Sequence, residues 1–112
     1  LVARGTVYCS NFSDQRVYGI RDGVARPVTA SGEWRYADFE IDARRQRLIC
    51  VREDHTRDQQ EPVNSLVSVS IDPTAVERGG HTHGAGQVLV SGADFYSTPR
   101  LSPDGSRLAW LS

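Results

Sequence analysis

The chain has 112 residues, of which 38% are hydrophobic and 24% are charged. This balance is typical of a folded domain and excludes a wholly disordered chain. The 13 basic residues are all arginine, and with 14 acidic residues they leave a formal net charge of −1. Composition therefore gives no reason to expect nucleic acid or an anionic membrane as a partner. No apolar run approaches the roughly 20 residues of a membrane-spanning helix.

Short apolar or alternating runs separated by turn residues recur along the whole sequence, and helical periodicity is hard to find. In chain order, these runs predict strands at 7–10, 16–20, 24–29, 36–41, 47–52, 64–71, 87–90, 96–101 and 107–111. The last two are joined by Pro-Asp-Gly-Ser at 103–106, a sequence that suits a tight turn. The pattern indicates an all-β chain folded as an antiparallel meander.

An internal repeat organises these strands. The run from Tyr36 aligns with the run from Tyr96, which places Leu48 opposite Leu108, 60 residues later. The run around Val7 aligns with the run around Leu48, 41 residues later. A period of about 40–45 residues is typical of a four-stranded propeller blade. The longer second period is explained by polar insertions at 54–62 and 73–86.

The repeat predicts four-stranded antiparallel β-propeller blades, with strands a to d running from the inside outward. Residues 1–32 would form a partial blade with strands b to d, residues 33–92 a complete blade, and residues 93–112 a partial blade with strands a and b. A segment of a longer propeller is expected to be cut in this way. Its incomplete blades would expose strand edges and apolar faces, so we expect self-association or low stability of this chain alone.

Two sets of motifs resemble known families. The segment 99–110, with Pro103-Asp104-Gly105 at its turn, resembles the hairpin of TolB-like propeller repeats. Further motifs at 10–18, 35–38, 51–55, 61–67 and 91–96 occur in the order found in bacterial prolyl-oligopeptidase-type serine peptidases. They resemble the N-terminal propeller of these enzymes, especially of the acylaminoacyl-peptidase and dipeptidyl-aminopeptidase-like branch. The resemblance covers nearly the whole chain and is weakest at 73–86.

This resemblance implies a parent protein in which the propeller precedes an α/β-hydrolase domain with a Ser-Asp-His triad. The propeller would gate or orient peptide substrates, so the implied partners are the hydrolase domain and the peptide. The sequence contains no G-x-S-x-G nucleophile elbow, and this chain alone is not expected to hydrolyse peptides. No cofactor or metal is implied. The alternative is a stand-alone TolB-like or WD-like scaffold for protein–protein interaction.

Successive connections of a meander alternate between two sides of its sheets. The b–c and d–a connections place most of the family-like motifs on one side, which we expect to face the hydrolase domain or the peptide. The candidate residues there are Trp34, Arg35, Tyr36, Asp38, Glu53, Asp54, His55, Asp94, Phe95 and Tyr96. A purely structural alternative has both tyrosines packing between blades, and Asp38 and Asp94 capping turns through backbone amides.

Other reactive side chains have simpler explanations. Glu53-Asp54-His55 could be an acid–base set, an ion-pairing or amine-recognising patch, or a solvated turn. Cys9 and Cys50 lie in apolar runs and are expected to be inert buried thiols, which fits a reducing cytoplasm. His81-Thr82-His83 offers two metal ligands but no third nearby, so a glycine-rich loop is the better interpretation. Arg44, Arg45 and Arg47 are expected on a solvated turn.

Overall fold

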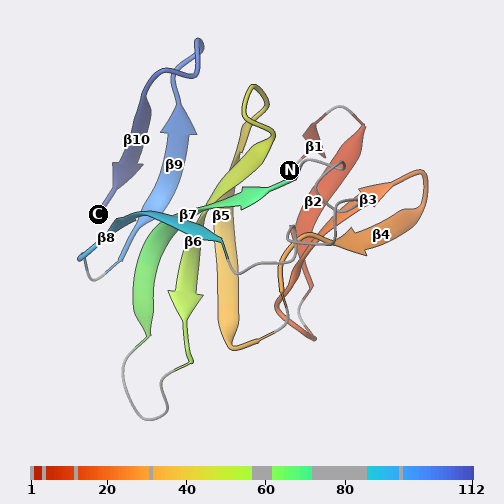
Figure 1. Cartoon of the computed structure of the whole chain (residues 1–112), viewed down its shortest axis with the longest axis horizontal. Coiled ribbons are helices and arrows are strands. Elements are labelled where there is room, and N and C mark those ends of the chain that lie inside the picture. The colour runs from red at the N-terminus through yellow and green to blue at the C-terminus, as the bar shows by residue number, and fades with distance from the viewer. Residues whose placement is uncertain are drawn as a thin grey trace.

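The computed structural model describes residues 2–3, 5–11, 13–30, 32–56, 62–71, 86–93 and 95–112. These residues form antiparallel strands in three sheets, and no helix occurs among them (Figure 1). The prediction of an all-β antiparallel chain is therefore confirmed. In the described ranges there is accordingly no helix of the length and apolarity needed to cross a membrane.

The first sheet contains four strands in sequential order: β1 (Val2–Ala3), β2 (Thr6–Ser10), β3 (Val17–Arg21) and β4 (Val24–Pro27). Strands β3 and β4 are joined by Asp22 and Gly23, both with positive φ, as a type I′ hairpin turn requires. Strand β1 was not predicted, because residues 1–32 were expected to hold only strands b to d. It has two residues, too few for the alternation that identifies a strand in sequence, and pairs with β2.

The second sheet is larger and also follows chain order: β5 (Trp34–Asp42), β6 (Arg47–Asp54), β7 (Val63–Ser70) and β8 (Gln87–Ser91). The third contains β9 (Ser97–Leu101) and β10 (Leu108–Leu111). Each of the nine predicted strands overlaps one of these elements. The sheets change between β4 and β5 and between β8 and β9. Their assignment as blades of a closed propeller, divided at residues 32 and 92, stays a prediction.

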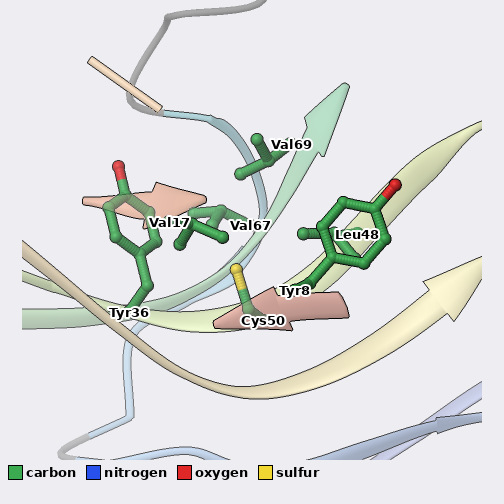
Figure 2. Packing of buried hydrophobic residues seen from close by; sticks show 7 residues of the cluster. All are labelled: Tyr8, Val17, Tyr36, Leu48, Cys50, Val67 and Val69. Carbon is green, nitrogen blue, oxygen red and sulfur yellow. The ribbon is translucent and has the colours of Figure 1, made fainter. Parts of the chain in front are cut away.

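The main apolar core lies between the first and second sheets. Alternation along β6 directs Leu48 and Cys50 towards it, and their cross-strand partners Val69 and Val67 lie on the same side. Figure 2 shows the buried side chains of this first core, Tyr8, Val17, Tyr36, Leu48, Cys50, Val67 and Val69. A smaller second core, Val51, Leu66 and Tyr96, joins the opposite side of the second sheet to the start of the third. Both faces of the second sheet are thus engaged.

Strands β5 and β9 contain the same irregularity. Each has a register shift against its neighbour, centred on Asp38 in β5 and on Thr98 in β9. Both residues have positive φ, 55° and 53°, which is uncommon for residues other than glycine. They are 60 residues apart, the offset at which Tyr36 aligns with Tyr96. The repeat inferred from the sequence is therefore present in the backbone as a pair of matching bulges.

The two cysteines are both free, but their surroundings differ. Cys50 is fully buried in the first core, and burial raises the pKa of its thiol to about 12. Cys9 is only half-buried on β2. The expectation of two buried thiols is therefore correct for Cys50 and wrong for Cys9, whose side chain alternates away from the side on which Tyr8 joins the core.

This difference predicts selective thiol modification. Iodoacetamide at pH 8 should label Cys9 in the folded protein, while Cys50 should react only after denaturation, because the thiolate is the reactive form. Peptide mass spectrometry of the native and urea-unfolded protein measures both sites, with Cys9→Ser as the control for assignment. Rapid labelling of Cys50 in the native protein would contradict the packing of the first core.

Candidate functional site

Most of the candidate residues meet at one end of the second sheet, where β5 begins and β6 ends. Antiparallel pairing sets Trp34 opposite Asp54, Arg35 opposite Glu53 and Tyr36 opposite Arg52. This end also adjoins the first sheet, since the Ser10 hydroxyl donates to the Tyr36 carbonyl at 2.9 Å. In Figure 1 it lies at the lower side, whereas the β5–β6 and β9–β10 turns lie at the upper side. Two motifs separated in sequence are thus brought side by side.

Three charged or titratable side chains form the exposed part of this end, and we call Arg35, Glu53 and His55 the Glu53 cluster. Glu53 Oε2 lies 3.0 Å from His55 Nε2, and their side chains are 46% and 27% exposed. Arg35 is the cross-strand partner of Glu53, so both occupy one face of the sheet. A carboxylate beside an imidazole can attract a cationic group, and the pair is an ion pair only when the imidazole is protonated.

Backbone contacts hold the cluster in place. The His55 N–H donates to the Glu33 carbonyl at 2.7 Å, which ties the end of β6 to the segment entering β5. Asp54 Oδ1 accepts the Thr56 N–H at 2.9 Å, a local turn contact. The Glu53 cluster therefore projects from a fixed strand end, as functional side chains on a rigid scaffold should.

The aromatic candidates occupy packing positions. Tyr36 is 5% exposed in the first core, and burial raises the pKa of its phenol well above the ordinary value. Tyr96 is equally buried in the second core, and its hydroxyl oxygen accepts the Ala93 N–H at 2.9 Å. Trp34 packs against the first core and covers Gly32, where an added Cβ would approach the indole to 2.3 Å. The burial of Tyr36 and Tyr96 agrees with the alternative in which both tyrosines have a packing role.

The structure describes two of the remaining candidates, Asp38 and Phe95. Asp38 is in the β5 bulge, where its Oδ2 accepts the Thr98 N–H at 3.2 Å. Asp38 therefore accepts a hydrogen bond from a backbone amide, as in the alternative of a purely structural role. The amide belongs to the third sheet, however, and not to a turn next to Asp38. Phe95 is 56% exposed after β8. Asp94 lies outside the described residues.

A charged network at the opposite end of the second sheet was not predicted from the sequence. The Asp42 side chain is 2% exposed, and its Oδ2 lies 3.0 Å from Arg45 Nη1 and 2.9 Å from Arg47 Nε. Arg45 and Arg47 were expected on a solvated turn. The sequence pattern that could have indicated this network is an aspartate at the end of β5, with one arginine in the following turn and another at the start of β6.

The structure offers no metal centre in the part of the chain that it describes. No group of three or more His, Cys, Asp or Glu side chains gathers there. His81 and His83, together with nearly all of the 73–86 insertion, lie outside the described residues. The local chemistry of the described site is thus that of a charged surface at a strand end.

Comparison with known proteins places this fold. No family model matches the chain, and no curated protein matches it. Among solved structures, a puromycin-hydrolysing peptidase of Mycobacterium tuberculosis is similar, with a TM-score of 0.75 and 30% sequence identity. The match covers 98% of this chain and 18% of the peptidase chain. The chain therefore has a peptidase-related fold, similar over nearly its whole length to a short segment of that enzyme.

Proposed function

We propose that the chain is a non-catalytic propeller segment of a prolyl-oligopeptidase-type serine peptidase, of the acylaminoacyl-peptidase or dipeptidyl-aminopeptidase-like branch. It would gate or orient peptides for an α/β-hydrolase domain, in the cytoplasm. The observation that carries the proposal is the match over 98% of this chain to a segment of a peptidase. The order of the family-like motifs, found independently in the sequence, points to the same class.

Within this proposal, the Glu53 cluster is the part that meets the hydrolase domain or the peptide. Its polar side chains are partly exposed, while the neighbouring Tyr36 is buried in the first core. It also lies on the side that carries the β2–β3 connection, another family-like motif. We therefore expect Arg35 and His55 to affect substrate capture and the tyrosine to affect folding.

A segment exchange tests the proposal. The matching segment of the mycobacterial peptidase is replaced by this chain, and puromycin hydrolysis by the chimaera is measured. If the chain is an equivalent segment, the chimaera should fold and retain hydrolysis. Arg35→Ala or His55→Ala in the chimaera should raise KM by about threefold with little change in kcat, as the loss of about 0.7 kcal/mol of uniform binding would.

The matched control is Arg44→Ala, which removes an exposed arginine from the turn between β5 and β6, at the other end of the sheet. It should leave KM unchanged. A folded but inactive chimaera would contradict the proposal that this chain is a peptidase segment, and it would favour a stand-alone scaffold. If the chimaera is active and KM is the same in every variant, the Glu53 cluster does not contribute to substrate binding. A reading frame that encodes G-x-S-x-G downstream, followed by Asp and His, would independently support the peptidase over the scaffold.

A further inference from the structure

The two joints between neighbouring sheets are built from different chemistry. The first core joins the first and second sheets through seven buried side chains, all of them apolar or aromatic except the Cys50 thiol. Between the second and third sheets the buried cluster has three members, and it lies near the start of β9. Along β9 the Pro99 side chain is also fully buried, and carboxylates from β5 accept hydrogen bonds from the Thr98 and Leu101 amides on either side of it. Polar bonds therefore add to apolar burial in attaching the third sheet.

Three contacts make up this polar joint. Asp38 Oδ2 accepts the Thr98 N–H at 3.2 Å, and Glu40 Oε2 accepts the Leu101 N–H at 3.0 Å. Arg45 Nη1 donates to the Gly105 carbonyl at 3.0 Å while it also bonds Asp42. Each contact joins the second sheet, or its β5–β6 turn, to the β9–β10 hairpin, at a separation of 60 or 61 residues.

The β5 bulge is what directs these carboxylates to one side. In a regular strand, residues 36, 38 and 40 would share a face and residue 41 would lie on the other. Here Tyr36, Phe39 and Ile41 all pack against the first core, while Asp38 and Glu40 reach β9. The bulge at Asp38, where φ is positive, adds one residue to β5, and this extra residue shifts the alternation of the side chains that follow it. The same irregularity thus completes the apolar core and assembles the polar joint.

We infer that Asp38, Glu40 and the Asp42–Arg45 pair form an acid-releasable clasp that holds the β9–β10 hairpin on the second sheet. Carboxylate acceptors form charge-assisted hydrogen bonds, roughly twice as strong as neutral ones, so protonation weakens them. The first core contains no carboxylate and should be unaffected by the same change. Acid would therefore loosen the third sheet before the joint between the first two.

Charged groups of both signs surround the clasp. From the second sheet and its turn they are Asp38, Glu40, Asp42, Arg45 and Arg47, and from the hairpin Arg100, Asp104 and Arg107. Burial alone would raise the pKa of Asp42, but hydrogen bonds from Arg45 and Arg47 outweigh it and lower that pKa below the ordinary value. Asp42 should therefore stay charged below the ordinary aspartate range and keep its bond to Arg45 there.

Amide hydrogen exchange of the full chain, followed by NMR, tests the clasp directly. Protection factors, which correct for the intrinsic effect of pH, are measured for Thr98 and Leu101 at pH 7 and pH 3. Asp38→Ala should reduce protection of Thr98 at pH 7 by about tenfold, and Glu40→Ala should do the same for Leu101. Wild-type protection of both amides should fall at pH 3, while the Val17 amide, bonded to Thr29 Oγ1 at 3.0 Å, serves as an internal reference.

Two further variants separate charge from folding. Asp38→Asn and Glu40→Gln keep a neutral oxygen acceptor and should show intermediate protection that no longer depends on pH. Glu33→Ala removes an exposed carboxylate from the segment before β5 and should behave as the wild type. Unchanged protection of Thr98 and Leu101 in the alanine variants would overturn the clasp. So would an acid-induced loss that is equally large at Val17, since that would be unfolding of the whole chain.

Discussion

Replacing Leu48 with alanine should lower the free energy of unfolding by about 3 kcal/mol, the largest loss expected from a single substitution here. Leu48 is fully buried in the first core, between Val69 on the neighbouring strand and the side chains of the first sheet. Its truncation removes apolar contact and leaves a cavity, because neighbouring strands tied by backbone hydrogen bonds can collapse only partly. Urea denaturation followed by circular dichroism measures the change.

The repeat provides a matched control. Leu108 is the same residue type 60 positions later, on β10, but it is only half-buried. Leu108→Ala should therefore cost about 1 kcal/mol or less, since less apolar area is returned to water. Equal losses at the two positions would mean that the first core is not the principal source of stability.

Asp42→Ala should have the second largest effect, a loss of about 2 kcal/mol at pH 7. Its carboxylate is 2% exposed and bonds Arg45 and Arg47, so truncation leaves both guanidinium groups without this partner. The pKa of Asp42 is lowered in the folded protein, so its contribution is present above the ordinary aspartate pKa. It should be lost as the pH falls through the lowered value.

The measurement is a series of urea titrations from pH 7 to pH 2, with wild type and variant in parallel. Their difference in stability should be largest at neutral pH and should shrink towards acid. Asp104→Ala is the control, because hydrogen bonds from Ser102 and Ser106 lower the pKa of this exposed carboxylate to about 2. Its truncation should cost less than that of Asp42. If the difference in stability between the wild type and Asp42→Ala is the same at pH 2 as at pH 7, the Asp42 carboxylate does not stabilise the fold through its charge.

Strand positions could be predicted because half-buried strands alternate with period two. The run from Leu66 to Ile71 alternates, and Val67 and Val69 on one face are buried as expected, although Leu66 and Ser68 on the other face are buried as well. Strand order then followed from the meander, which is why Arg35 and Glu53 could be assigned to the same end of a sheet. The two-residue strand β1 has too little alternation to be recognised, although it completes the first sheet.

The role of Asp38 could not be predicted, because a bulge shifts the phase of every side chain that follows it. Alternation read from Tyr36 would place Asp38 on the core side, whereas the structure directs it to Thr98. No glycine marks the positive φ in the sequence, since aspartate tolerates this conformation better than most residues. Burial of Tyr36 and Tyr96 was one of two alternatives left open by the sequence, because it depends on sheets that pack across long sequence separations.

The placement of the tryptophans has a spectroscopic consequence. The chain contains two of them: Trp34 packs beside the first core, and Trp110 lies on β10 with 38% of its surface exposed. Indole emission moves to longer wavelength as water reaches the ring, so the two residues form a built-in pair of fluorophores, one beside the first core and one on the third sheet. Single Trp→Phe replacements would separate them and allow the unfolding of each region to be followed in real time without an added label.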